Sequence, residues 1–131
     1  MSWVLSDEEI RSVLALVGAN RYRYWVKKVA DQQQTWSLCR DGGWALAGDD
    51  SGRELIPVWP HEAFASLCAI GMWAGYQPKA IAVDAWLDRW IPGMVNDGRL
   101  VAVFPTTQEK GVAVEPRNVE SDLREELLQY D

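Results

Sequence analysis

The chain has 131 residues, 48% of them hydrophobic and 24% charged, with a formal net charge of −6. This size suits one domain around one core, and the composition excludes a disordered chain. An acidic protein repels nucleic-acid phosphates and anionic lipids, so we expect neither nucleic acid nor a membrane as a partner. The start of the chain lacks the basic segment and apolar run of a secretory signal, which predicts a cytoplasmic protein.

Two helices are predicted at the start of the chain. In the first, Ser6 can cap the initial turn and Glu9 can complete a capping box. Apolar residues then recur at helical spacing up to Val17, and Gly18 ends the run.

The second predicted helix, over residues 20–31, is amphipathic. Its apolar stripe consists of Tyr22, Trp25, Val26 and Val29. Its basic residues point mainly elsewhere, and they are Arg21, Arg23, Lys27 and Lys28. We interpret this basic face as a solvated surface, with docking to an acidic partner, such as a second copy of the protein, as the alternative.

A β-meander is predicted over residues 36–59. Trp36 and Leu38 share one face of its first strand, and glycine-containing turns follow at residues 41–43 and 49–52. The third strand contains Pro57, which lacks a backbone donor and therefore predicts an edge strand or a strand end. A helix from Pro60 follows, whose expected buried stripe is Ala63, Phe64, Leu67 and Cys68.

The second half of the chain alternates between strands and helices. Residues 72–79 are predicted to form a loop, residues 80–83 a strand, and a helix then begins at Asp84 and breaks or kinks at Pro92. The uninterrupted apolar run over residues 100–104 is typical of a central strand covered on both faces.

A hairpin follows, with its second strand predicted over residues 112–114, and a last helix is predicted to begin at Pro116. The element order predicts an α+β fold with a mixed, mostly antiparallel sheet of five to six strands. We expect residues 1–131 to form a single domain.

Five segments carry a family resemblance: RYRYWVKKVAD, WSLCRDGGWALAGDDSG, LIPVWPHEAFA, PKAIAVDAWLDRW and DGRLVAVFP followed by GVAVEP. Through them the chain from Arg21 to Leu123 resembles the bacterial family catalogued as domain of unknown function 2750 (DUF2750). That family has no assigned activity, so the resemblance implies no catalytic residues. From Leu55 to Val119 the element order also looks like the N-terminal domain of the enhanced-serine-sensitivity (SseB) family, which supports an α+β domain.

No motif for a metal, cofactor or nucleotide is present, and no cofactor is predicted. The single histidine, His61, stands at a helix start beside Glu62, but Ala65 at i+4 offers no second metal ligand. We interpret His61 as a polar cap residue and keep an enzyme of unfamiliar type using His61 as an alternative. The turn aspartates are interpreted as turn formers, because aspartate beside glycine bonds the local backbone; they are Asp41, Asp49 and Asp50.

The two cysteines, Cys39 and Cys68, form no disulfide or zinc pattern and are expected to be reduced. Among the eight tryptophans, Trp25, Trp86 and Trp90 lie at helical spacing and are predicted core residues. Other aromatic residues lie at strand ends or in a glycine-rich loop. Together with His61 they are the predicted binding residues: Trp44, Trp59, Trp73 and Tyr76.

Acidity, abundant aromatic residues and the lack of a catalytic constellation favour a non-enzymatic protein that binds another macromolecule. The expected partner is a protein, either a basic one or a second copy of this chain. An acidic protein that neutralises a basic toxin would be one form of this function. The alternative is a small-molecule or carbohydrate-binding domain with a pocket lined by those four aromatic residues.

Overall fold

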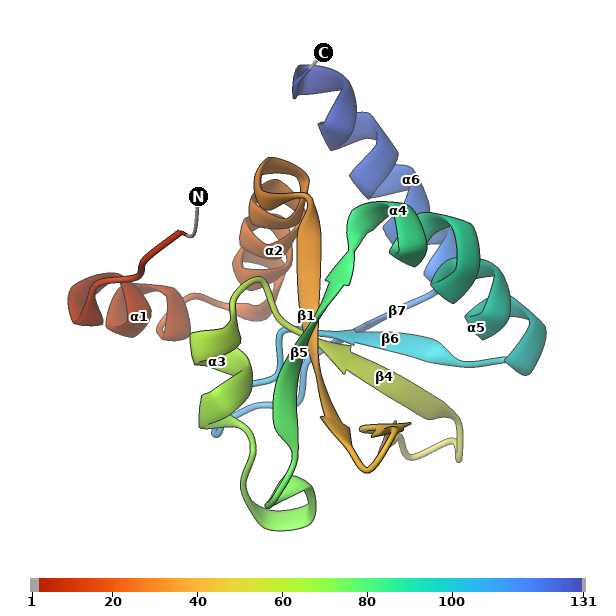
Figure 1. The fold of residues 1–131 in the computed structure, drawn as a ribbon, viewed down its shortest axis with the longest axis horizontal. Coiled ribbons are helices and arrows are strands. Elements are labelled where there is room, and N and C mark those ends of the chain that lie inside the picture. The colour runs from red at the N-terminus through yellow and green to blue at the C-terminus, as the bar shows by residue number, and fades with distance from the viewer. Residues whose placement is uncertain (1–2, 131) are drawn as a thin grey trace.

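The computed structural model describes residues 3–130 and has an α+β fold (Figure 1). The α-helices are α1 (Asp7–Leu14), α2 (Gly18–Gln32), α3 (Glu62–Leu67), α4 (Val83–Ala85), α5 (Ile91–Asp97) and α6 (Pro116–Leu127). Other helical turns are η1 (Gly71–Trp73), η2 (Trp86–Trp90) and η3 (Leu128–Tyr130). The strands are β1 (Gln34–Arg40), β2 (Gly43–Trp44), β3 (Ala47–Gly48), β4 (Glu54–Val58), β5 (Gln77–Ala82), β6 (Leu100–Val103) and β7 (Val112–Val114).

The first two helices are joined by side-chain hydrogen bonds. The Ser6 hydroxyl caps α1 by accepting a bond from the Glu9 amide at 3.1 Å, as predicted. The Glu9 carboxylate does not complete a capping box, because it accepts a bond of 2.8 Å from the Tyr24 hydroxyl on α2. Burial, with this bond in support, raises the pKa of Tyr24 above its ordinary value. Gly18 does not end α1; it opens α2, while α1 stops at Leu14.

The strands form two sheets that meet at one point. Their orders are β2-β1-β5 and β3-β4-β6-β7, and every strand pair is antiparallel except the parallel pair of β4 with β6. Trp36 of β1 and Trp59, which follows β4, exchange two backbone hydrogen bonds of 2.8 Å each. The predicted mixed, mostly antiparallel arrangement is confirmed, but the strands form two sheets joined by this bridge rather than one sheet of five to six strands, and the predicted meander is divided between them.

Pro57 does not lie on an edge strand, because β4 runs between β3 and β6. The Val58 carbonyl accepts a bond of 2.8 Å from the Phe104 amide, so the backbone N–H and C=O of Val58 point toward β6. The backbone groups of its neighbour Pro57 therefore point to the opposite side of the strand. On that side β3 has already ended, and the Pro57 carbonyl accepts a bond of 2.6 Å from the Ser37 hydroxyl of β1. The missing N–H of Pro57 therefore falls in the gap between β3 and β1.

Of the break or kink predicted at Pro92, the break does not occur. The helix continues from α4 into α5 through η2, a π-helical turn in which the Ile91 amide bonds the Trp86 carbonyl. A π turn widens the helix by one residue, and here it comes just before the proline that cannot donate a backbone bond. The helix therefore accommodates Pro92 without ending.

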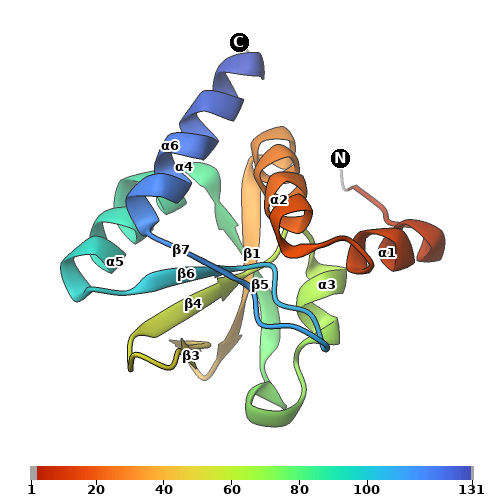
Figure 2. The same ribbon diagram turned by 180° about the vertical axis from the view of Figure 1, so that it is seen from behind.

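The main core lies between the sheets and the helices. In Figures 1 and 2, α2, α5 and α6 gather on one side of β4, β6 and β7. Val101 and Val103 of β6 point into this core. Leu100 and Ala102 point to the opposite face, where they form a small separate cluster with Leu55. The prediction that β6 is buried on both faces is confirmed, but helices cover only one of them.

A chain of four indoles runs from this core to the surface. Trp25 contacts Trp86 edge-on with ring centroids 6.3 Å apart, and Trp86 stacks on Trp90 at 5.8 Å. Trp90 then meets Trp44 edge-on at 4.7 Å. The Trp86 indole N–H has no hydrogen-bond partner within residues 3–130. The core assignment of Trp25 and Trp86 is confirmed, and Trp90 is half-buried.

Arg21 is buried, with 1% of its surface exposed, so the prediction that it faces outward is wrong. Its Nε donates to the Phe104 carbonyl at 3.3 Å and its Nη1 to the Leu16 carbonyl at 2.5 Å. Nη1 also lies 2.8 Å from the Glu109 carboxylate. Phe104 has a φ of 58°, a conformation that costs free energy in a bulky residue, and the bond from Arg21 stabilises it.

Replacing Arg21 with methionine (R21M) should lower the free energy of unfolding by about 3 kcal/mol, because two carbonyl groups lose their donor. Urea denaturation followed by circular dichroism measures this change. The matched control is Arg23→Met on the exposed side of α2, which should stay within about 0.5 kcal/mol of wild type. Equal effects at the two positions would contradict the assigned role of Arg21.

Cys68 and Cys39 should differ in reactivity. Burial raises the pKa of the Cys68 thiol to about 11, and its Sγ lies 3.4 Å from the Pro105 carbonyl, whereas Cys39 is half-buried on β1. Because the thiolate is the reacting species, a disulfide reagent at pH 8 should modify Cys39 first and Cys68 only on unfolding. Mass spectrometry of partly labelled protein checks the order. Equally fast labelling of both thiols would show that Cys68 is not sealed in the core.

Candidate functional site

A groove of about 450 Å³ lies on the outer face of sheet β3-β4-β6-β7, and we call it the sheet groove. One wall is η1, with Met72 and Trp73, and the other is the loop of residues 105–111. In Figure 2, β3, the blue loop after β6 and the green turn at η1 all lie below β4 and β6. The floor consists of apolar side chains from four strands, namely Ala47, Leu55, Ala102 and Ala113.

The loop wall is held rigidly. The Thr106 hydroxyl accepts bonds from the amides of Gln108 and Glu109 at 3.2 and 3.0 Å. The Glu109 carboxylate pairs with buried Arg21. The loop then returns so close to β6 that a Cβ on Gly111 would stand 2.8 Å from the Val103 carbonyl oxygen, which favours glycine at this position.

The opposite wall rests on a buried tryptophan. Trp73 donates its indole N–H to the Leu46 carbonyl at 3.3 Å and packs edge-on against Trp59, with centroids 5.9 Å apart. Trp59 is 0% exposed and donates to the Pro105 carbonyl of the loop wall at 2.8 Å. One buried indole therefore supports both walls of the sheet groove.

Exposed apolar side chains continue from η1 beyond the groove. Leu67, Ile70 and Met72 are 44%, 58% and 74% exposed, and we call them the apolar lip. Single exposed apolar residues are ordinary, but three within six positions beside an apolar groove extend one surface. Met72 belongs to both the sheet groove and the apolar lip, so the two meet at this residue. The inward orientation predicted for Leu67 is wrong.

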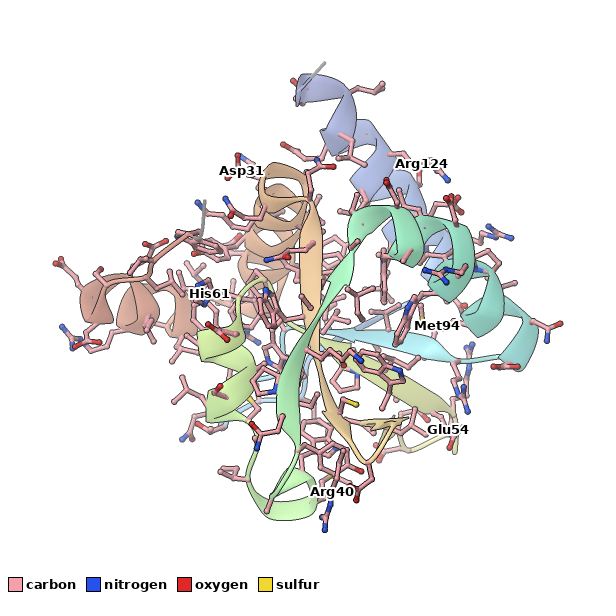
Figure 3. The ribbon with its side chains drawn as sticks, viewed as in Figure 1. Asp31, Arg40, Glu54, His61, Met94 and Arg124 are labelled. Atoms are coloured by element: carbon pink, nitrogen blue, oxygen red, sulfur yellow. The ribbon has the colours of Figure 1, made fainter. Side chains whose placement is uncertain are left out.

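The predicted aromatic residues do not share a pocket. Trp73 lines the sheet groove, whereas Trp44 lines a different hollow of about 510 Å³ between β4 and α5, beside Met94. Trp59 is buried in the core, and Tyr76 is half-buried against the core. Figure 3 places Met94 and His61 on opposite sides of β1. A single pocket lined by all four aromatic residues is therefore not formed, because Trp73 and Trp44 line different hollows and Trp59 lies in the core.

Both ring nitrogens of His61 are engaged. The residue caps α3, its Nδ1 accepting a bond of 3.0 Å from the Ala63 amide. Nε2 therefore carries the proton and donates to the Trp3 carbonyl at 2.7 Å. This is the geometry of a cap residue. Within residues 3–130 no group of three histidine, cysteine or carboxylate side chains is placed to hold a metal ion.

Among the turn aspartates, Asp49 bonds its own turn. Asp49 accepts bonds at one carboxylate oxygen from the Ser51 hydroxyl at 2.7 Å and the Arg53 amide at 2.9 Å. Both bonds lower the pKa of the Asp49 carboxyl, and the bond from the Ser51 hydroxyl has the larger effect. Asp41 has a φ of 52° in the turn between β1 and β2. Asp49 therefore has the predicted local role, whereas the Asp41 carboxylate lies 3.7 Å from the Arg40 guanidinium.

Of the groove lining, Trp73 alone was predicted as a binding residue. The alternation in β6 could have shown that Leu100 and Ala102 share a face, yet it gave no sign that helices leave this face open. A second signal was the run from Leu67 to Met72, which carries apolar residues in a segment too short and irregular to bury them all.

No helix of the described chain has the length and apolar character needed to cross a membrane. Neither a curated protein nor a solved structure matches the chain. Residues 22–123 do match a family described as "Protein of unknown function (DUF2750)". This match covers most of the 131 residues and includes the groove floor, both groove walls and the apolar lip. The chain therefore belongs to the DUF2750 family.

Proposed function

We propose that this protein is a non-enzymatic protein-binding domain whose partner is a basic protein that docks on the sheet groove and the apolar lip. The observation that carries the proposal is the outer face of sheet β3-β4-β6-β7. The face of a sheet that is exposed to water ordinarily carries polar side chains, but the residues of the groove floor are apolar in every strand. A partner would supply the layer that covers it.

The groove and the lip together have the character of an interface. A stable interface buries roughly 800 Å² on each partner, more than a groove of this kind offers alone, so contact would extend over the lip. Trp73 provides a half-buried aromatic anchor at the boundary of the two. Met72, 74% exposed, has a flexible side chain that can adapt to an apolar partner surface.

The charge of the protein favours a basic partner. Three charged residues line the groove: Asp49, Glu109 and Lys110. Arg21 offsets the charge of Glu109, so the groove itself is close to neutral and its contribution is apolar contact. The net charge of −6 acts at longer range and would speed encounter with a cationic protein. Neutralisation of a basic toxin is one form that such an association would take.

The geometry of the reactive side chains supports binding over catalysis. His61 uses both ring nitrogens in structural hydrogen bonds, and burial keeps the Cys68 thiol protonated. Asp49 is committed to its own turn. None of these groups faces another in a shared cleft.

Replacing Ala113 with glutamate (A113E) should abolish partner binding, because this exposed strand residue lines the groove and a longer charged side chain would fill it. The bait is purified protein with a photo-cross-linking amino acid in place of Met72, incubated in extract of the source cell. The wild-type bait should cross-link to a basic protein, and A113E should give at least tenfold fewer cross-links. The wild-type yield should also fall as added salt screens the charges.

The matched control is Ala82→Glu, an exposed alanine on β5 outside the groove, which should leave the cross-links unchanged. Urea denaturation of both variants establishes that each is folded. An acidic partner, a yield independent of salt, or equal yields from A113E and wild type would each count against the proposal.

A further inference from the structure

A second hollow, of about 440 Å³, lies between the N-terminal segment, β1 and the start of α3. We call it the β1 pocket. It shares no lining residue with the sheet groove. Its volume falls within the range of small-molecule sites. The side chains that matter are those of Trp3, Gln32, Gln34, Trp36, His61 and Glu62.

The residues that form the walls of the β1 pocket are held in place by hydrogen bonds. Gln34 and Trp36 are two positions apart on β1, so their side chains share one face of the strand. β1 pairs with β5 along its length, and Trp36 is also held by the two backbone bonds to Trp59. Trp3 is secured by the 2.7 Å bond from His61 to its carbonyl and by edge-on contact of the two rings at 5.0 Å.

Several polar groups that line this pocket are not engaged by other protein groups. The Gln34 amide, the Glu62 carboxylate and the Trp36 indole N–H make no hydrogen bond to any other residue in the range 3–130. The side-chain amide nitrogen of Gln32 donates a bond of 2.8 Å to the Asp31 carboxylate, so its side-chain carbonyl oxygen remains available as an acceptor. The pocket therefore offers both donors and acceptors, and Trp36 contributes an indole to the same lining.

The surroundings restrict the charge of a ligand. Glu62 repels phosphates and carboxylates, and no lysine or arginine lines the pocket to offset it. A cationic ligand would compete with Lys28, whose ammonium already lies 4.7 Å from the centroid of the Trp3 ring. A neutral ligand is not repelled by Glu62, and it leaves Lys28 in place on the Trp3 ring if it packs on the Trp36 indole instead.

We propose that the β1 pocket binds a small neutral polyhydroxylated molecule, a saccharide. Indole faces pack against the C–H faces of a sugar ring, and amide and carboxylate groups pair with vicinal hydroxyls as donor and acceptor. Trp36 supplies the ring face, since Lys28 lies over the Trp3 ring, while Gln34 and Glu62 supply the polar contacts. This inference does not rest on the protein-binding role of the sheet groove.

The test follows the indole N–H signals of ¹⁵N-labelled full-length protein by NMR, with the Trp36 signal assigned through its loss in Trp36→Phe. Glucose, mannose, N-acetylglucosamine and maltose are titrated separately, each up to its solubility limit. At least one should shift the Trp36 signal saturably. Gln34→Ala and Glu62→Gln should each weaken that binding by about tenfold, which corresponds to losing one hydrogen bond to the ligand.

The matched control is Gln77→Ala on β5, an exposed glutamine that does not line the pocket, and it should bind as wild type does. The remaining indole signals show whether each variant is folded. The inference is overturned if no sugar of the panel shifts the Trp36 signal, if tetramethylammonium or phosphate shifts it instead, or if both pocket variants bind with wild-type affinity. A113E fills the sheet groove and should leave sugar binding intact, so the two proposals fail separately.

Discussion

The buried guanidinium of Arg21 is the interaction on which the core and the sheet groove both depend. An arginine is stable inside a protein only when its donors and its charge are satisfied, and here the carbonyls of Leu16 and Phe104 and the carboxylate of Glu109 do so. These groups belong to the α1–α2 link, the end of β6 and the groove wall. One side chain therefore fixes three segments, and the wall is positioned from inside the molecule.

Local signals in the sequence predicted much of the fold. The Ser6 cap, the apolar stripe of α2 and the apolar run of β6 each depend on neighbouring residues alone, and each is confirmed. The outward orientation predicted for Arg21 and the edge strand predicted as one place for Pro57 are wrong because the partners of both residues are distant in sequence. Arg21 donates to the Phe104 carbonyl, 83 positions away in the sequence. Pro57 is accommodated inside the sheet because Ser37 of β1 lies beside it and bonds its carbonyl.

The candidate site was harder to predict than the fold. The sequence identifies aromatic residues near turns, but whether an indole is buried depends on which strands cross beside it. Trp59 was predicted to bind and is buried at the junction of the two sheets, while Trp36, which shares a strand face with Leu38, is half-buried and borders the β1 pocket. The open face under the sheet groove has no local signal, because burial on one face of a strand is decided by where the helices go.

The chain of indoles from Trp25 to Trp44 has a spectroscopic consequence. Aromatic rings in contact couple their electronic transitions, and the spacings of 6.3, 5.8 and 4.7 Å along this chain are contact distances. Such coupling adds an exciton couplet to the far-ultraviolet circular dichroism, where helices also absorb. A substitution at Trp90 would remove part of the couplet and change the apparent helix content while every helix stays folded.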